Sequence, residues 1–349
     1  MINVDVVVVG AGQAGLSSGY FLRRAGIEHV VLDADRGPGG AWQHRWPTLR
    51  MATVHGIHDL PAMPFEVVDE RAPANEVLPA YFADFERRND IHVRRPVSVT
   101  AVRNGDDGGL LVESADETWS ARALINATGT WTHPFWPHYP GQELFRGRQL
   151  HTANYVRPEE FAGQHVIVVG GGSSAIQLQL EIQRVATTTW VTRREPLFTD
   201  EPFTHDIGRA VVARVDEAVR AGRPPASVVS VTGLFRTPQV RAAQEAGLMD
   251  RLPMFDRITP TGVAWNDGRE IRADAILWNT GFRAAIDHLA PLKLRGPGGG
   301  IKLDGTRVVA DPRVHLVGYG PSASTVGASR AGRAAVREIR ELLAPVPIG

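Results

Sequence analysis

The sequence predicts an α/β fold that contains two Rossmann-like domains of the three-layer ββα type, the second inserted into the first. The valine run Val6–Val9 leads into Gly10-x-Gly12-x-x-Gly15. A copy begins 160 residues later, where Val166–Val169 leads into Gly170-x-Gly172. A further apolar strand and a helix, over residues 314–343, then end the chain. We expect this last pair to complete the first domain.

The first glycine motif has the context of a dinucleotide-binding unit. Four apolar β-formers before it predict a buried parallel strand. In such a motif the first glycine makes a tight turn, the second lets the backbone approach a pyrophosphate, and the third lets the next helix pack on the strand. A helix over 16–25, a strand over 30–32 and an acceptor for a ribose hydroxyl, Asp33, follow. The contacts expected here involve the following residues: Gly10, Gly12, Gln13, Ala14, Gly15 and Asp33. The alternative is a glycine turn without a ligand.

Composition excludes several function classes. The chain of 349 residues has a formal net charge of zero, so nothing favours a nucleic-acid partner. It has no cysteine, which excludes disulfides, thiolate metal sites and redox dithiols. We expect no metal site. The first strand starts near the N-terminus and no apolar run approaches the ~18 residues of a membrane span, so a cytoplasmic protein with no membrane partner is expected.

The segment after Asp33 combines glycines with two tryptophans. Gly39 and Gly40 mark a turn where backbone approaches a ligand, and Trp42 and Trp46 are suited to walling a flat cofactor. The alternative is a surface turn followed by core tryptophans. Because the segment directly follows the first motif, we place Gly40, Trp42 and Trp46 among the cofactor-binding residues.

The rest of the first domain is expected to be less regular. Residues 52–80 are rich in proline, and their His55 and His58 are more typical of structural or exposed histidines than of catalytic ones. A helix over 77–89 precedes short strands, the last of which ends at Ala127-Thr128-Gly129. We assign these three residues to cofactor binding as well.

The second motif differs from the first in one charge. Gly10 corresponds to Gly170, Gly12 to Gly172, and Asp33 to Arg193. A carboxylate accepts from a free 2′-hydroxyl, whereas a guanidinium pair suits a 2′-phosphate. The first site therefore fits FAD or NAD and the second fits NADPH, with an exposed basic pair as the alternative. The residues expected at the second site are Gly170, Gly172, Ser173, Ser174, Arg193 and Arg194.

A second internal echo supports two linked domains. Residues 121–129 resemble residues 273–281, and both segments are apolar strands that end in Thr-Gly, which adds Thr280 and Gly281 to the second site. Residues 199–260 are expected to contain two helices and to form a lid or part of a dimer surface. Near the C-terminus, Gly318 follows the last strand and is assigned to the first site.

Between the two motifs stands Phe145-x-Gly147-x-x-x-His151-x-x-x-Tyr155. This spacing resembles the fingerprint of class B flavoprotein monooxygenases, and the chain as a whole is most similar to the short bacterial flavin-containing monooxygenases. The resemblance implies an FAD-binding domain over 1–155 and 282–349 with an NAD(P)H-binding domain over 156–281. It also implies that His151 has a conformational role. Family members are often dimers, so a homodimer is compatible with the resemblance.

The resemblance implies an NADPH-dependent enzyme that inserts one oxygen atom of O₂ into a small sulfide, amine or ketone through a C4a-(hydro)peroxyflavin. NADH is the other donor that the family leaves open. Since the flavin carries the chemistry, no catalytic residue is assigned, and the candidates near the flavin are Arg50, Met51, Thr53 and His55. The family often has an asparagine here, which residues 49–55 lack. The alternative function is an NAD(P)H:acceptor oxidoreductase or NADPH oxidase without productive oxygenation.

Overall fold

The computed structural model describes residues 1–54, 57–200, 205–225 and 234–344. His55 therefore lies outside the described residues. The chain forms two compact units. The first comprises residues 1–130, 212–226 and 284–349, and the second comprises residues 131–211 and 227–283.

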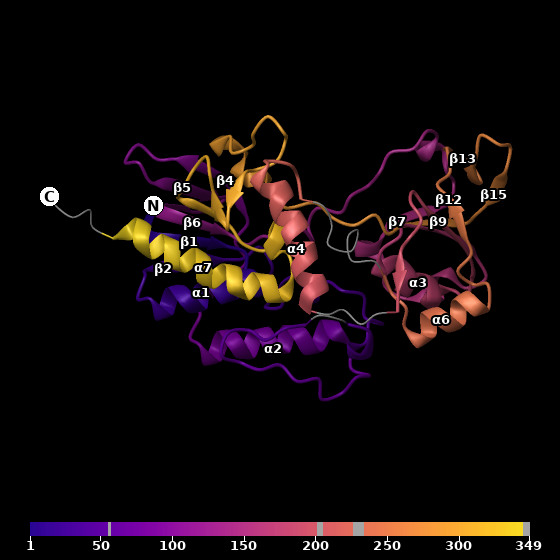
Figure 1. Cartoon of the computed structure of the whole chain (residues 1–349), viewed down its shortest axis with the longest axis horizontal. Helices are drawn as coiled ribbons and strands as arrows, with labels where there is room; N and C mark the ends of the chain where they lie inside the picture. The colour runs from indigo at the N-terminus through magenta and orange to yellow at the C-terminus, as the bar shows by residue number, and fades with distance from the viewer. Residues whose placement is uncertain (55–56, 201–204, 226–233, 345–349) are drawn as a thin grey trace. The chain divides into compact units, whose positions relative to one another are not determined.

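The first unit is built on a sheet whose parallel core has β1 (Ile2–Val9) at its centre (Figure 1). On one side β1 pairs with β2 (His29–Leu32), and on the other with β6 (Thr118–Asn126). Beyond β2 lies β3 (Val93–Arg94), and beyond β6 lies β19 (Val314–Leu316). The C-terminal strand thus joins the sheet of the N-terminal motif.

The two faces of this sheet have different covers. Val6 and Val8 pack into an apolar cluster with helices, whereas Val7 and Val9 pack into a cluster on the other face, because successive side chains of a strand alternate. The helices of the first cluster are α1 (Gln13–Arg24), α2 (Ala74–Arg88) and α7 (Thr325–Leu343). The other face is covered partly by β4 (Val99–Asn104) and β5 (Leu110–Ser114), which continue the sheet antiparallel from β6. Two more short strands, β17 (Leu303–Asp304) and β18 (Arg307–Val308), extend the sheet from β19.

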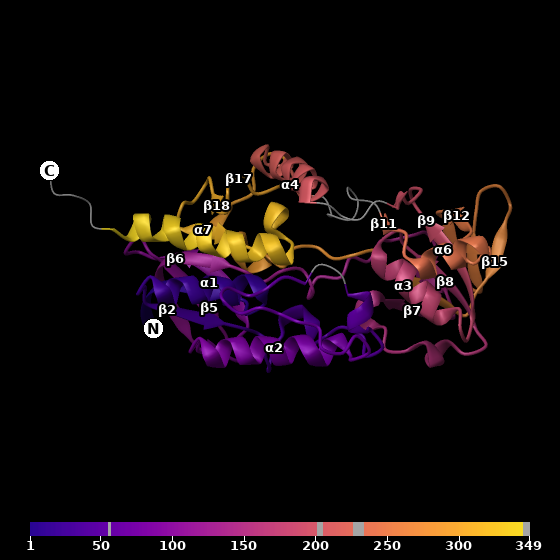
Figure 2. The ribbon, with the colours of Figure 1, turned by 60° about the horizontal axis from the view of Figure 1, so that its bottom comes forward.

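Helices α1 and α7 lie side by side, as Figures 1 and 2 show. Small residues allow this approach: a Cβ on Gly332 would lie 3.0 Å from Ser18 Oγ, and Ser17 Oγ donates to the carbonyl of Ser329 at 3.2 Å. The C-terminal helix is therefore an integral layer of the unit that contains the first glycine motif.

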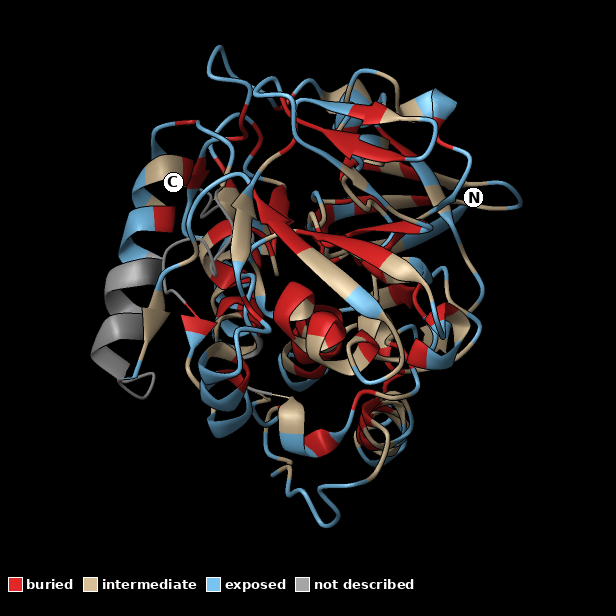
Figure 3. Ribbon diagram, turned by 90° about the vertical axis from the view of Figure 1, so that its right-hand side faces the viewer, coloured by how far each residue is buried: buried red, intermediate tan, exposed pale blue. Residues whose placement is uncertain are grey.

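The second unit has a five-stranded parallel sheet in the order β12-β9-β8-β16-β7. Its strands are β7 (Arg148–His151), β8 (His165–Val169), β9 (Thr187–Thr192), β12 (Arg251–Pro253) and β16 (Ala275–Trp278). Its helices include α3 (Ser173–Ile182) and α6 (Pro238–Glu245). An antiparallel sheet of β13 (Arg257–Thr259), β14 (Gly262–Ala264) and β15 (Glu270–Arg272) shares an apolar cluster with the parallel sheet. Figure 3 shows buried residues both on strands and on helices.

The predicted α/β fold with two Rossmann-like units is confirmed, and the structure adds two points of chain assignment. Strand β7 pairs with β16, so residues 131–155, which we expected with the first domain, pack within the second unit. Helix α4 (His205–Arg220) was expected within the second domain, but residues 212–225 belong to the first unit, where Val219 joins the apolar cluster of Tyr319. A two-residue ladder of β10 (Phe198–Thr199) and β11 (Leu234–Phe235) stands apart from the larger sheets. Of the helices in the described ranges, none is long and apolar enough to cross a membrane.

Candidate functional site

The three glycines of the first motif have three different surroundings. Gly10 has φ +98°, and a Cβ there would lie 2.6 Å from the carbonyl oxygen of Ala127. A Cβ on Gly15 would lie 1.8 Å from the carbonyl oxygen of Gly10, so only glycine allows α1 to pack this closely on β1. A Cβ on Gly12 would meet nothing within 4 Å. The first and third glycines are thus required by the fold, whereas the second borders open space.

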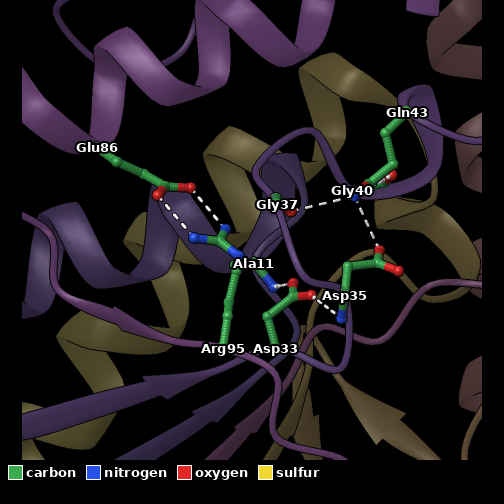
Figure 4. Close-up of polar contacts among 8 residues, drawn as sticks. All are labelled: Ala11, Asp33, Asp35, Gly37, Gly40, Gln43, Glu86 and Arg95. Carbon is green, nitrogen blue, oxygen red and sulfur yellow. Dashed lines mark hydrogen bonds and ion pairs between the residues drawn. The ribbon is translucent and has the colours of Figure 1, made fainter.

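Asp33 holds this loop from the end of β2 (Figure 4). Its Oδ2 accepts from the backbone N–H of Ala11 at 2.5 Å, and its Oδ1 accepts from that of Asp35 at 2.8 Å. The side chain is buried. Burial raises the pKa of the Asp33 carboxyl, and the two N–H donors and the nearby Arg95 oppose that rise. Each oxygen has one lone pair engaged and a second for another donor.

Arg95 is itself held in place near Asp33. Its guanidinium forms two parallel hydrogen bonds to the Glu86 carboxylate, at 2.8 and 2.7 Å, and both side chains are largely buried. A bidentate pair of this kind fixes the orientation of the guanidinium. The sequence did not single out Arg95 or Glu86, because their pairing joins α2 to the loop after β3 and leaves no local pattern.

The turn at Gly39 and Gly40 packs on the first glycine motif. Gly40 has φ +50°, and a Cβ there would lie 2.8 Å from Cα of Gly12. The Gln43 amide braces the turn by donating to Asp35 Oδ2 at 3.0 Å and to the carbonyl of Gly37 at 3.2 Å. The structure therefore brings Gly40 directly to the motif.

The two tryptophans after this turn lie in apolar surroundings. Trp46 is buried, and Trp42 is partly buried against the helix-side cluster of the first unit. Their positions satisfy a packing role, which was the alternative considered for them, and do not by themselves identify a ligand contact.

The end of β6 lies beside the first glycine motif, and the Thr128 hydroxyl that follows it already forms hydrogen bonds within the protein. Thr128 Oγ1 donates to the carbonyl of Ala285 at 2.6 Å and accepts from the Asn126 amide at 3.0 Å. His288 Nε2 donates to Asn126 Oδ1 at 2.7 Å. What residues 127–129 offer a ligand is therefore chiefly backbone. Gly318 also reaches the motif, since a Cβ there would lie 3.2 Å from Cβ of Ala14.

Two of the candidates expected near the flavin, Met51 and Thr53, lie in a short 3₁₀ turn, Met51–Thr53, and Arg50 directly precedes it. Met51 is buried, Arg50 is exposed, and Thr53 Oγ1 donates to the carbonyl of Arg50 at 3.0 Å. Among the described residues of this stretch, Arg50 carries the only ionisable side chain. The turn thus offers no acid–base pair of its own.

The second motif repeats the pattern of the first. Gly170 has φ +135°, and a Cβ there would lie 2.3 Å from the carbonyl oxygen of Asn279. A Cβ on Gly172 would meet nothing within 4 Å, and α3 starts directly after it at Ser173 and Ser174. Ala175, the counterpart of Gly15, is fully buried.

The ends of β9 and β16 carry the other candidates of the second unit. Arg193 and Arg194 follow β9 and are exposed, and neither guanidinium has an ion-pair partner within the described ranges. Thr280 Oγ1 donates to the carbonyl of Phe135, so its hydroxyl is engaged. Gly281 has φ +77°, and a Cβ on it would meet nothing within 4 Å.

Three residues of the fingerprint between the motifs, Gly147, His151 and Tyr155, have structural roles. A Cβ on Gly147 would lie 2.3 Å from the carbonyl oxygen of Asp274. His151 is buried, accepts from the N–H of Ala153 at Nδ1 (3.2 Å) and donates from Nε2 to the carbonyl of Gly281 (3.0 Å). Burial lowers its pKa, so the neutral ring bridges β7 and the end of β16. Tyr155 stacks on Phe161 with ring centroids 6.0 Å apart.

These residues fit a dinucleotide in each unit. Gly12 and Gly172 leave open a space that a side chain would fill, at the N-terminus of a helix whose first amides lack partners in the helix. The chain also matches a family model described as pyridine nucleotide-disulphide oxidoreductase over residues 7–242. Because the chain has no cysteine, it shares the nucleotide-binding fold of that family without its dithiol.

A solved flavin monooxygenase from Stenotrophomonas maltophilia, in a doubly substituted form, is 40% identical to this chain. The match covers 99% of this chain and 100% of that one, with a TM-score of 0.85. The chain belongs to the class B flavoprotein monooxygenases. This monooxygenase is accordingly a flavin-dependent oxidoreductase that uses a nicotinamide nucleotide.

More distant relatives of this monooxygenase include the indole-3-pyruvate monooxygenase YUCCA1 of Oryza sativa subsp. japonica, 27% identical over 80% of this chain and 77% of that protein. The oxidoreductase CzcO of Bacillus velezensis is 27% identical over 56% of each chain. The match thus spans about half the length of that relative, so its likeness concerns only part of the molecule.

Proposed function

We propose that this flavoprotein binds FAD in its first unit and NADPH in its second, and inserts one oxygen atom of O₂ into a small sulfide, amine or ketone. One observation carries the proposal: the chain has two glycine cradles of the same shape with opposite charge at the end of the second strand. Asp33 stands at the first, and Arg193 with Arg194 at the second. The proposal includes the homodimer that the family implies, which light scattering tests.

For FAD, the proposed contacts use hydrogen-bonding capacity and open space that the fold itself does not occupy. The second lone pairs of the Asp33 carboxylate would accept from ribose hydroxyls, while the first ones keep the loop closed through Ala11. The pyrophosphate would lie over Gly12, whose missing Cβ leaves room, at the positive end of α1. When bound and reduced, the flavin supplies the electrons that activate O₂.

For NADPH, the proposed selectivity comes from Arg193 and Arg194. A guanidinium binds a 2′-phosphate through charge-assisted hydrogen bonds, and NADH has no group to receive them. Replacing Arg193 by alanine is expected to raise the KM for NADPH roughly 10- to 100-fold, from about 1.5–3 kcal/mol per charged hydrogen bond. The KM for NADH should change little. Arg272→Ala, which removes another exposed arginine of the second unit, is the matched control.

Oxygen transfer is tested by mass spectrometry of products formed under ¹⁸O₂, with NADPH consumption and hydrogen peroxide measured in the same reactions. A panel of sulfides, amines and ketones covers the proposed substrate classes. One ¹⁸O atom per product molecule is the expected result. The absence of asparagine and of any ionisable group except Arg50 in the described part of residues 49–54 favours the second candidate, an NAD(P)H oxidase or acceptor reductase. Peroxide equal to the NADPH consumed, with every substrate, would replace the first candidate by the second.

A further inference from the structure

Arg251 lies on the edge strand β12, next to β9, which ends at Thr192 just before Arg193. Strands β12 and β9 are parallel, with Arg251 opposite Trp190 and Pro253 opposite Thr192. From this position Arg251 Nη1 donates to both the carbonyl oxygen and Oγ1 of Thr192, each at 3.1 Å. The guanidinium of Arg251 thus ties the end of β9 to its neighbour by side-chain contacts.

Thr192 passes this restraint to the basic pair. Its side chain is buried, and its Oγ1 donates to the carbonyl of Arg194 at 2.7 Å. A hydroxyl has one proton to donate and two lone pairs to accept, so donation to Arg194 and acceptance from Arg251 are mutually consistent. The result is a relay from Arg251 through Thr192 to the backbone of the Arg193–Arg194 turn.

We propose that Arg251 is a positioning residue for nucleotide selection, which acts through Thr192 to hold the turn that presents Arg193 and Arg194 to a 2′-phosphate. The inference rests on the proposed NADPH site. A turn that is already ordered loses less conformational entropy on binding, so more of the interaction energy appears as affinity. The relay should therefore matter for NADPH and hardly for NADH.

The hydrogen bonds, rather than the charge of Arg251, carry this effect. Two exposed carboxylates are sequence neighbours of these arginines, Glu195 after the turn and Asp250 before Arg251. A substitution that keeps all the charges but breaks the relay is therefore the most informative change. Thr192→Val is such a substitution, since valine has nearly the shape of threonine and lacks the hydroxyl.

The test uses the FAD-loaded protein and calorimetric titration with NADP⁺ and NAD⁺, so that it does not depend on turnover. Thr192→Val and Arg251→Met are each expected to weaken NADP⁺ binding about 3- to 30-fold and NAD⁺ binding by less than about 2-fold. Thr192→Ser keeps the hydroxyl and should retain the wild-type ratio. The double variant should bind NADP⁺ no more weakly than the single variant with the lower NADP⁺ affinity, because both substitutions remove the same relay. 2′,5′-ADP and 5′-AMP as probes should repeat the contrast.

Two results would overturn the inference. One is an equal loss of NADP⁺ and NAD⁺ affinity in both variants, which would make the relay merely structural. The other is an unchanged NADP⁺ affinity in both while Arg193→Ala still discriminates against NADP⁺, which would leave the proposed function intact. An Arg193→Ala variant that affects both nucleotides equally would instead overturn the NADPH site itself. Melting temperature and FAD content report folding. If Thr192→Val does not fold, the test relies on Arg251→Met, since Arg251 is only half-buried.

Discussion

Gly12 gives the sharpest test of the proposed flavin site, because its substitution separates binding from folding. A Cβ on this residue would meet no protein atom within 4 Å, and its φ of −74° is open to alanine. The only cost to the fold is the exchange of glycine for alanine at a helix N-cap, about 1 kcal/mol. Gly12→Ala should therefore fold with nearly wild-type stability.

The methyl group would occupy the space that we assign to the pyrophosphate. If it displaces the phosphates from two charge-assisted hydrogen bonds, worth about 1.5–3 kcal/mol each, the loss is about 3–6 kcal/mol. FAD affinity should then fall roughly 10²- to 10⁴-fold. The assay is titration of the apoprotein with FAD, followed by quenching of flavin fluorescence, alongside urea unfolding of the same apoprotein.

The second motif supplies the matched control. Gly172 has the same open surroundings, so Gly172→Ala should leave FAD affinity unchanged and weaken NADP⁺ binding to the FAD-loaded protein. A Gly12→Ala variant that binds FAD with the wild-type dissociation constant would refute the reasoning. So would a loss of FAD affinity that is equal in the two variants.

Two further predictions concern the fold. Gly15→Ala places a Cβ 1.8 Å from the carbonyl oxygen of Gly10, so α1 must shift, and the free energy of unfolding measured by urea titration should fall by about 1–3 kcal/mol or more. Ala175→Gly, at the equivalent place in the second motif, should lower it by about 1 kcal/mol. Equal stability of Gly15→Ala and the wild type would contradict the packing argument. Burial lowers the pKa of His315 to about 4, so the folded protein holds this side chain in its neutral form. The free energy of unfolding is therefore highest above the unfolded pKa of about 6.5, and it falls by about 3 kcal/mol as the pH drops from there through 4. His315→Gln should flatten the pH dependence of the unfolding free energy over this range, and an unchanged slope would show that the side chain titrates normally.

The strands that carry the motifs could be predicted because their signals are local. Val6–Val9 and Val166–Val169 are apolar runs bounded by glycine, and both are central strands of their sheets. The acid after β2 and the bases after β9 were likewise visible as single residues at a fixed distance from a motif. Such features depend on the backbone geometry of one βαβ unit, which the sequence encodes within about 25 residues.

The remaining features depend on which strands become neighbours. β7 and β12 are short and contain arginine, so neither shows the pattern of a buried strand, yet their pairings put His151 beside β16 and Arg251 beside Thr192. Gly39 and Gly40 were expected to let backbone approach a ligand. Their immediate neighbours in the structure are Pro79 and Gly12, contacts that only the tertiary fold creates.

The return of residues 212–225 to the first unit affects how the molecule can be recombined. A gene segment encoding residues 131–283 would carry part of a helix whose Val219 belongs to the apolar cluster of the other unit. Exchanging the second unit with that of a relative therefore requires four breakpoints, near residues 130, 211, 226 and 283, rather than two. Chimeras joined at only the outer two would import a foreign surface against Tyr319 and Gly320, and their stability would report that mismatch rather than nucleotide preference.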